Sequence, residues 1–292
     1  MANLERRLPE NVAGDFFVDA TCIDCDACRQ IAPTVFRDHG DQSSVFHQPE
    51  TEEEERLALM SLAACPTGSI GTTRKHNTRI GVEAFPTKIS DNVYFCGFTS
   101  ESSFGAWSYL IVRPASEGGN VLVDSPRFTR PLVKKIAQMG GVRRMFLTHR
   151  DDIADHAQFA EKFGAERIMH AADGAQRHHI ERVIEGEAAV RLDDDLIVIP
   201  VPGHTRGHMV LLYKNRFLFT GDHLAWSPTR ESLTAFRSVC WYSWTEQTRS
   251  MERLLDYDFE WVLPGHGRLH RDTLNSMRSH LRHCIEWMKA TR

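Results

Sequence analysis

Residues 148–156 read THRDDIADH and directly follow the apolar run RRMFL of residues 143–147. A short apolar run between polar segments indicates a buried β-strand, so these polar residues stand where a strand ends. They include two imidazoles and three carboxylates, the side chains that bind transition metals in proteins. The five are His149, Asp151, Asp152, Asp155 and His156. This stretch therefore predicts a metal site at the edge of a β-sheet.

Three later fragments repeat this arrangement, in which an apolar run is followed by a glycine and a candidate ligand. They are PGHTRGH at 202–208 with His204 and His208, FTGDHL at 219–224 with Asp222, and LPGHG at 263–267 with His266. The glycines allow tight turns and a close approach of the backbone to the site. One histidine among 15 carries little weight. Four ordered fragments that each place a ligand after a strand predict one shared site.

The chain around these fragments alternates short β-rich runs with helical ones from residue 88 onward. Strands are expected at 93–97, 108–112, 121–124, 144–147, 167–170, 196–201, 208–213, 217–220 and 261–263. Helices are expected at 131–139, 154–163, 175–183, 245–257 and 272–291. Paired strands and strands followed by helices both occur, which predicts a layered α/β (α+β) domain.

The order and content of the four fragments resemble the metallo-β-lactamase superfamily, and glyoxalase II-type sequences most of all. The resemblance covers about residues 88–270 and implies an αββα sandwich with a site for two metal ions, iron or zinc, at one edge. It implies a first metal held by His149, Asp151 and His204, a second held by Asp155, His156 and His266, and Asp222 as the bridge. Asp155 and Asp222 would be the catalytic carboxylates, and Asp124 in VLVDSP (121–126) would support the site.

The first fragment departs from the usual superfamily pattern H-x-H-x-D-H, because this chain has H-R-D-D-I-A-D-H. Asp151 stands where the second histidine is expected, the loop is two residues longer, and Asp152 is an equally placed carboxylate. A carboxylate in place of an imidazole adds a negative charge and a hard oxygen donor, which favours iron or manganese. The flavodiiron branch of the superfamily also has a carboxylate there. Iron is therefore an alternative to zinc.

A second motif, CIDCDAC at residues 22–28, spaces Cys22, Cys25 and Cys28 three residues apart, and Cys65 is followed by Pro66. Such spacing lets one loop present three thiolates to a cluster while the fourth comes from elsewhere. Zinc sites usually pair two C-x-x-C units, so an iron–sulfur cluster is favoured. The segment resembles single-cluster [4Fe–4S] ferredoxins over about residues 15–72, which implies one cluster that carries one electron.

These motifs divide the chain into three parts. Residues 1–75 are expected to form a small α+β ferredoxin-like domain, 76–87 a linker, and 88–292 the metallo-β-lactamase-fold domain. The C-terminal pattern Met277, Leu281, Cys284 and Met288 has helical spacing and predicts a core-facing side of the last helix.

Composition restricts the partners. The chain is 41% hydrophobic and 25% charged with a net charge of −4, and the acidic excess lies in residues 1–75. Nucleic-acid binding needs a basic face, so it is not expected. The apolar runs are too short to span a bilayer, and the first residues contain no apolar secretion signal. We expect a cytoplasmic protein that acts on a small-molecule substrate. A redox partner protein and a second copy of the chain, in a homodimer, are its candidate partners.

Three functions are compatible with these motifs. A hydrolase would attack an ester, thioester or lactam carbonyl with a metal-bridged water. A di-iron oxidoreductase would instead receive electrons from its own ferredoxin domain and reduce O₂ or another small oxidant. A non-enzymatic redox sensor is the third reading, and it would predict a damaged set of metal ligands.

Overall fold

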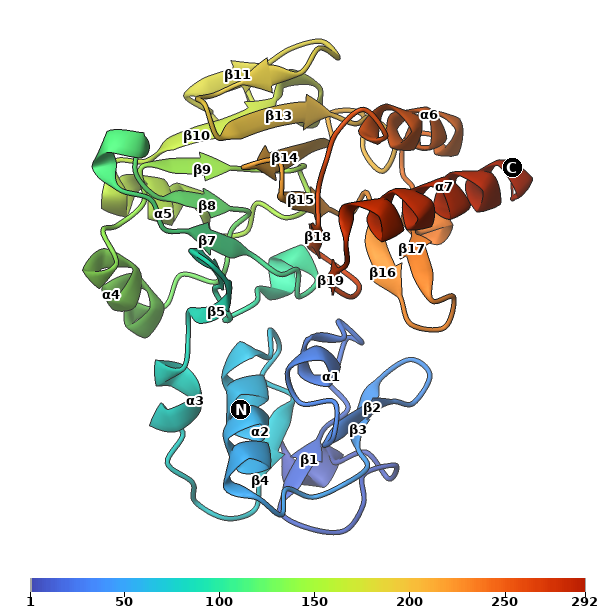
Figure 1. Cartoon of the computed structure of the whole chain (residues 1–292). Coiled ribbons are helices and arrows are strands. Elements are labelled where there is room, and N and C mark those ends of the chain that lie inside the picture. Colours follow the sequence, from blue (N-terminus) through green and yellow to red (C-terminus); the bar gives the residue numbers. More distant parts are fainter. Residues whose placement is uncertain (1, 292) are drawn as a thin grey trace.

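The computed structural model describes residues 2–291 and contains a small part and a larger layered part (Figure 1). The elements of the small part are β1 (Phe16–Val18), α1 (Ala27–Ile31), β2 (Phe36–Asp38), β3 (Ser43–Val45), α2 (Glu52–Ala64) and β4 (Ile70–Thr72). Strand β1 pairs with β4 and β2 pairs with β3, both antiparallel. The core of this part packs α2 onto these strands through Phe16, Val35, Phe36 and Leu59.

Local sequence explains both ends of α2. The Thr51 hydroxyl accepts a hydrogen bond from the Glu54 amide, and the Glu54 carboxylate accepts one from the Thr51 amide, at 3.2 Å each. This capping box satisfies free amides at the start of the helix. The positive end of the helix dipole also stabilises the four glutamates of the first turn. The helix ends before Pro66, which cannot continue it. Cys65 therefore sits at the end of a rigid element.

The larger part contains two β-sheets. The first has seven strands in the order β11-β10-β9-β8-β7-β6-β5, and the second has six in the order β12-β13-β14-β15-β18-β19. The first comprises β5 (Thr87–Ser90), β6 (Val93–Phe95), β7 (Tyr109–Ile111), β8 (Val121–Val123), β9 (Arg144–Phe146), β10 (Glu166–His170) and β11 (Arg182–Ile184). The second comprises β12 (Val190–Arg191), β13 (Leu196–Pro200), β14 (Met209–Tyr213), β15 (Phe217–Gly221), β18 (Trp261–Pro264) and β19 (His270–Arg271). The hairpin of β16 (Ala225–Ser227) and β17 (Ser232–Thr234) lies beside the second sheet.

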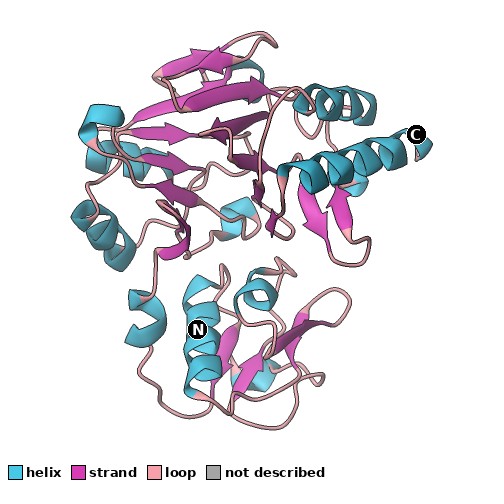
Figure 2. Ribbon diagram, viewed as in Figure 1, coloured by secondary structure: helices cyan, strands magenta, loops and turns pink. Residues whose placement is uncertain are grey.

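Helices cover the outer faces of both sheets (Figure 2). They are α4 (Arg130–Gln138) and α5 (His156–Phe163) on the first sheet, and α6 (Trp244–Leu254) and α7 (Leu274–Ala290) on the second. The sheets face one another across an apolar core in which the rings of Tyr109 and Phe219 lie 5.4 Å apart. A second core under α6 and α7 buries Met277, Leu281, Cys284 and Met288, as the helical spacing predicts. The layers form the αββα sandwich expected from the resemblance.

One expected helix is wrong. Residues 175–179 form turns instead of the start of a helix, and residues 182–184 form strand β11. Strand β11 pairs in parallel with β10, with Ile168 opposite Arg182. Pairing at the sheet edge overrides the local helical pattern, because it satisfies the backbone of both strands.

The two parts are packed directly against each other. The expected linker contains helix α3 (Arg79–Glu83), whose Gly81 lies so close to α2 that an added Cβ would be 2.1 Å from the Leu59 carbonyl oxygen. The backbone amide and hydroxyl of Thr99 both donate to the carbonyl of Ala64 at the end of α2. Arg127 donates to the carbonyls of Ala63 and Cys65 there. The larger part therefore caps the helix end that carries Cys65.

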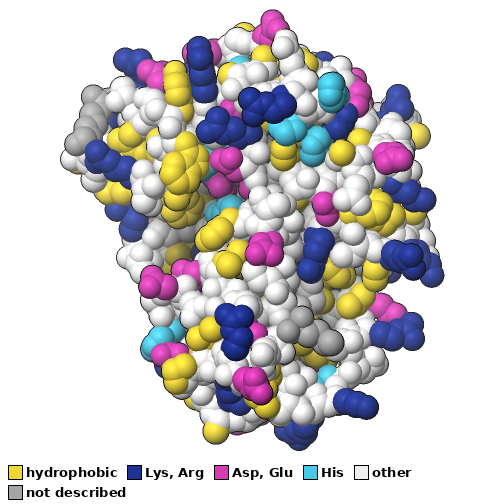
Figure 3. Space-filling view, turned by 180° about the vertical axis from the view of Figure 1, so that it is seen from behind, with side chains coloured by type: hydrophobic (Ala, Val, Ile, Leu, Met, Phe, Trp, Pro, Cys, Tyr) yellow, Lys and Arg dark blue, Asp and Glu magenta, His cyan; other side chains and the backbone are white. Residues whose placement is uncertain are grey.

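The surface carries charges of both signs. On the face seen in Figure 3, Lys and Arg side chains are interspersed with Asp and Glu over both parts, so this face shows no broad basic patch. Among residues 2–291, the helices are too short or too polar to cross a bilayer.

Candidate metal centre and cluster site

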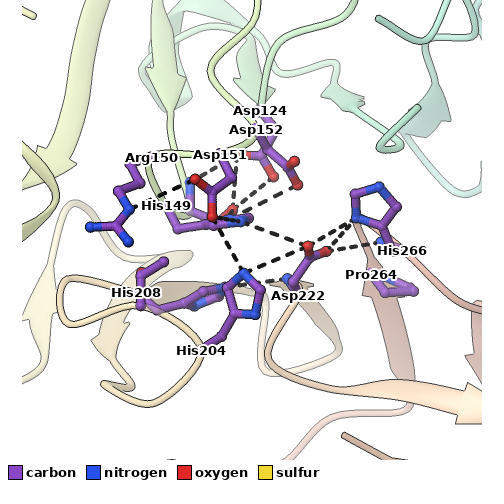
Figure 4. A network of polar contacts seen from close by, with 12 residues as sticks. Asp124, His149, Arg150, Asp151, Asp152, His204, His208, Asp222, Pro264 and His266 are labelled. Carbon is purple, nitrogen blue, oxygen red and sulfur yellow. Dashed lines mark hydrogen bonds and ion pairs between the residues drawn. The ribbon is translucent and has the colours of Figure 1, made fainter. Parts of the chain in front are cut away.

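Four loops bring most of the expected metal ligands together at one edge of the sandwich (Figure 4). His149 follows β9, His204 lies between β13 and β14, Asp222 follows β15 and His266 follows β18. Strands β15 and β18 are parallel, so their carboxyl ends meet at the same edge. The sequence fragments that are far apart in the chain thus converge as expected.

The first group of donors contains His149, His204 and Asp222. The Nε2 atoms of His149 and His204 lie 3.7 and 3.8 Å from Asp222 Oδ2. Asp151 joins them, with its Oδ2 at 3.9 Å from His149 Nε2 and 3.6 Å from His204 Nε2. These separations are long for hydrogen bonds, but they suit ligands that share an ion, since bonds of about 2.0–2.1 Å place tetrahedral ligands about 3.3 Å apart.

The second group contains Asp152, Asp222 and His266, whose donor atoms lie within 4.8 Å of one another. His266 Nδ1 is 2.8 Å from Asp222 Oδ1, and its Nε2 is 3.2 Å from the carbonyl oxygen of Phe104. Both ring nitrogens therefore donate. Although burial opposes it, the Asp222 carboxylate raises the pKa of His266 to about 10, so the ring is positively charged. A metal ion in this group would replace that proton.

Gly265 permits the close approach of this group. A Cβ added there would lie 2.5 Å from Asp152 Oδ2 and 3.0 Å from Asp222 Oδ1. Burial, and then the nearby Asp222 carboxylate, raise the pKa of Asp152 well above its ordinary value. A cation between the two carboxylates would remove this repulsion.

Unpartnered polar atoms test whether a metal pair fits this site. Five buried side-chain atoms of the donor residues have no hydrogen-bond partner within the described part of the chain: Nε2 of His149, both ring nitrogens of His204 and both carboxylate oxygens of Asp152. All three side chains are buried. Buried polar atoms without partners are costly, and metal ions accept the lone pairs of these atoms. The donor set therefore fits two metal ions.

Asp124 orients His149 through Thr148. The Asp124 carboxylate accepts hydrogen bonds from the Thr148 amide at 2.8 Å and from its hydroxyl at 3.0 Å. Since the hydroxyl donates its only proton to Asp124, its oxygen can accept from His149 Nδ1, which is 3.0 Å away. This arrangement leaves Nε2 of His149 as the atom with a free lone pair, which is how outer residues orient metal-binding histidines.

Asp173 positions the loop that carries His204, and the sequence patterns did not reveal it. Its carboxylate accepts hydrogen bonds from the Thr205 hydroxyl at 2.6 Å and the Gly207 amide at 2.7 Å. It also accepts one from the amide of Arg150 at 3.1 Å, which joins this loop to the first fragment. Its partners lie 32 and 34 positions later or 23 earlier, so no local pattern marks it. His208 supports the same region, because its Nε2 accepts from the Asp222 amide at 3.2 Å.

Two expected ligands lie outside both groups. Asp155 accepts a hydrogen bond from the Phe128 amide at 2.7 Å and stands at the start of α5. His156 begins that helix, with its Nδ1 3.3 Å from Arg167 Nη1. Burial, and then Arg167, lower the pKa of His156 to about 4. The structure thus places Asp152 in the second donor group, whereas Asp155 and His156, at the start of α5, lie outside both groups.

The four cysteines of the N-terminal motif gather in the small part. All seven cysteines of the described chain are free thiols. Burial, and to a smaller extent the neighbouring Cys65 and Cys22, raise the pKa of the Cys25 thiol to about 12. The amides of Ser43 and Ser69 point at the sulfur atoms of Cys22 and Cys65, at 3.4 and 3.3 Å. Iron would stabilise the thiolates that burial otherwise disfavours, so the four residues fit a cluster.

The cysteine and metal sites open onto one cavity of about 1100 Å³. Its lining includes Cys25 from the small part and Asp151, Asp152, His204, Asp222 and His266 from the larger part. Aromatic side chains provide much of the remaining wall, among them Phe36, Phe104, Trp226, Phe236 and Trp241. Arg268 donates to Asp26 across the boundary at 3.2 Å. Both parts of the chain therefore form the walls.

A short backbone segment connects the two sites. A Cβ added at Gly105 would lie 2.4 Å from the Cβ of Cys25, so the segment touches the cysteine loop. The carbonyl of the preceding residue, Phe104, accepts the hydrogen bond from His266 described above. One peptide segment thus contacts a cluster cysteine on one side and a metal-site histidine on the other.

Comparisons with known proteins define the two parts. Residues 18–72 match the family described as the 4Fe-4S single cluster domain of Ferredoxin I. The larger part shares its fold with the DIM-1 metallo-β-lactamase, with a TM-score of 0.54, 19% identity, and coverage of 70% of this chain and 96% of that one. A metallo-β-lactamase from Hirschia baltica gives a TM-score of 0.51 at 15% identity, over 68% and 96% of the two chains. The larger part therefore has the metallo-β-lactamase fold.

Curated relatives resemble the larger part in sequence. Hydroxyacylglutathione hydrolase from Fuscovulum blasticum is 33% identical over 39% of this chain and 47% of its own length. That of Anaeromyxobacter dehalogenans is 36% identical over 41% and 47%. The chain spans about half the length of the curated relatives it matches. In particular, the chain joins a segment that matches a single-cluster [4Fe–4S] ferredoxin domain to a part that has the metallo-β-lactamase fold and is similar in sequence to hydroxyacylglutathione hydrolases, in agreement with the resemblance drawn from the motifs.

Proposed function

We propose that this protein is a metal-dependent hydrolase of an ester or thioester substrate, similar in its reaction to hydroxyacylglutathione hydrolase. The observation that carries this proposal is the pair of donor groups that share Asp222 at the floor of a large cavity. Two ions bound in this way would lower the pKa of a water molecule and polarise a carbonyl oxygen. The likeness to hydroxyacylglutathione hydrolases supports a thioester substrate.

The proposed ligands differ in part from those expected from the resemblance. His149, Asp151 and His204 would hold the first ion, Asp152 and His266 would hold the second, and Asp222 could serve both. Asp152 takes the place first given to Asp155, both as ligand and as acceptor of the proton that the attacking water loses. Neither oxygen of its buried carboxylate has a hydrogen-bond partner among the described residues, so one oxygen could bind the ion while the other accepts the proton.

The residues around the two donor groups orient the site and form the wall of the cavity. Asp124 and Thr148 fix the ring of His149, and Asp173 fixes the loop of His204. The aromatic wall of the cavity, which includes Phe104, Trp226 and Trp241, supplies an apolar surface for the bulk of the substrate. Apolar walls with a few polar groups at one end are typical of small-molecule sites.

The test of this proposal is hydrolysis of a hydroxyacylglutathione thioester by the anaerobically purified chain, with and without a chelator. We expect steady turnover that the chelator abolishes and added zinc or iron restores. A matched panel of esters and lactams defines the acyl class. If protein that is shown to hold two metal ions cleaves no member of the panel, the hydrolase proposal is overturned.

A specific observation favours a second candidate, a di-iron oxidoreductase that takes electrons from its own cluster. Cys25 and the metal ligands line one cavity, and the Phe104–Gly105 segment contacts both sites. Asp151 supplies a hard oxygen donor, which suits iron. In this arrangement the cluster site lies beside the metal site of the same chain, so electron transfer would need no dimer. A homodimer and an external redox partner stay predictions.

Metal analysis combined with electron paramagnetic resonance distinguishes the two candidates. Two zinc ions per chain would exclude the oxidoreductase. A mixed-valence di-iron signal that appears when the cluster is reduced would favour it over the hydrolase. The Asp151→His variant, which restores the usual histidine, is expected to shift metal preference toward zinc.

A further inference from the structure

A second set of metal-type donors lies outside the main site. His270 in β19, Asp272 just after it and His280 in α7 place two imidazole nitrogens and one carboxylate oxygen within 4.8 Å of one another. None of the three lines the cavity of the main site or belongs to its ligand groups. We propose that they form a further binding site for a divalent transition-metal ion of the zinc type. This inference does not depend on the proposed hydrolase activity.

The distances favour a shared ion over direct hydrogen bonds. Asp272 Oδ2 is 3.4 Å from His280 Nε2 and 3.8 Å from His270 Nε2. Zinc bonds of about 2.0–2.1 Å place neighbouring tetrahedral ligands about 3.3 Å apart, so a small inward movement of His270 completes the geometry. The other oxygen, Asp272 Oδ1, accepts from the Thr273 amide at 2.7 Å. This bond directs Oδ2 toward the two imidazoles.

The Nε2 atom of His270 is available to bind an ion. This atom is buried and, within residues 2–291, has no hydrogen-bond partner. Trp226 stacks on the ring with a centroid distance of 3.5 Å and an angle of 5°, and its ring meets His280 edge-on at 4.9 Å. The indole holds both imidazoles in place. Donors that are already ordered lose little conformational entropy when an ion binds.

The backbone holds the three donors on separate elements. His270 pairs with Val262 in the sheet, and the amide of Trp226 donates to the carbonyl of Arg268. Thr273 caps α7, with its hydroxyl accepting from the Ser276 amide at 3.3 Å, which fixes where His280 stands in the helix. The site would therefore join β19 to α7 beside the β16–β17 hairpin. Trp226 of this hairpin also lines the main cavity, so a bound ion would stiffen one wall of it.

The chemistry indicates the class of ion. Two neutral imidazoles and one carboxylate form a three-residue set that suits zinc and leaves a fourth position for water. The side chains of His270, Asp272 and His280 are 20%, 33% and 23% exposed, so water can reach that position. Calcium and magnesium prefer sites made only of oxygen, so they are not expected here.

The test is zinc stoichiometry in the full chain, measured by equilibrium dialysis and elemental analysis, with the cluster counted separately. We expect the unaltered chain to bind one zinc equivalent more than Asp272→Asn, a variant that retains the Oδ1 acceptor for Thr273. His280→Ala should lose the same equivalent. His283→Ala is the matched control, because His283 lies on the exposed side of the same helix and its loss should change nothing.

The outcome does not depend on the main site. Suppose that Asp222→Asn empties the main site. The Asp222→Asn variant should then still bind one zinc equivalent more than the double variant Asp222→Asn/Asp272→Asn. Equal zinc binding in the unaltered chain, Asp272→Asn and His280→Ala would overturn the proposal and leave these residues as a stacked ion pair. Thermal unfolding and cluster content, measured on each variant, identify any that fails to fold.

Discussion

The cysteine loop and the histidine–aspartate site are encoded in opposite ways. Cys22, Cys25 and Cys28 lie within seven consecutive residues, so their spacing alone predicts one loop around one cluster. The ligands of the metal site come from four loops spread between His149 and His266, and each needs a strand and a neighbour to hold it. A motif within one loop can be read from spacing, whereas a site assembled from many loops also depends on how each loop folds.

The Asp222→Asn variant tests whether these regions bind their metals independently and should have the largest effect. Asp222 belongs to both donor groups, so we expect loss of both ions from the main site and a fall in thioester hydrolysis on the order of 10³-fold. Iron and sulfide of the cluster should be unchanged. A variant that retains both ions would contradict the shared role of Asp222.

The Gly105→Ala variant tests the contact between the two regions. Gly105 has a φ of +83°, and its added Cβ would meet Cys25, so we expect a destabilisation of roughly 2 to 4 kcal/mol and a loss of cluster content. Gly186→Ala is the control, because Gly186 has a φ of +74° with no atom within 4 Å among the described residues. It should lose only about 1 kcal/mol. Equal shifts in the thermal midpoints of the two variants would show that Gly105 does not support the cysteine loop.

Asp152→Asn and Asp155→Asn distinguish the ligand set of the structure from the one implied by the resemblance. We expect Asp152→Asn to lose about one metal equivalent, because its buried oxygens face the second group. Asp155→Asn can still accept from the Phe128 amide and should retain both ions. Elemental analysis measures both. The reverse result would restore Asp155 as the ligand.

A small pH effect should arise where the start of the linker contacts the ferredoxin part. Burial by itself lowers the pKa of His76. The carboxylates of Asp15 and Glu55, at 2.5 and 2.7 Å from its ring nitrogens, outweigh burial and raise this pKa above its usual value. Its charged form therefore stabilises the fold at low pH, and this contribution is lost as pH rises through the raised pKa. We expect His76→Gln to cost less than about 1 kcal/mol at pH 6 and to cost nothing at pH 9. Urea unfolding at both pH values measures this, and an equal cost at both would disprove the charge effect.

Much of the fold could be predicted from the sequence, with particular exceptions. The strands that precede His149, His204, Asp222 and His266 were expected close to where the structure has them, because buried strands need continuous apolar runs. The helix expected at 175–183 was wrong, because β11 gains its partner from β10. Asp173 escaped notice because it contacts loops more than 20 positions away.

The sequence by itself determined the two kinds of domain, the four cysteines that could hold a cluster and most of the candidate metal donors that the structure brings together, because their spacing limits what the backbone can do. Only the tertiary structure decided that Asp152 enters the site while Asp155 starts α5, since two carboxylates in one loop look alike until the loop is folded. It also decided that Cys25 and His266 face the same cavity. That proximity depends on how two cores pack, and no local pattern in either domain records it.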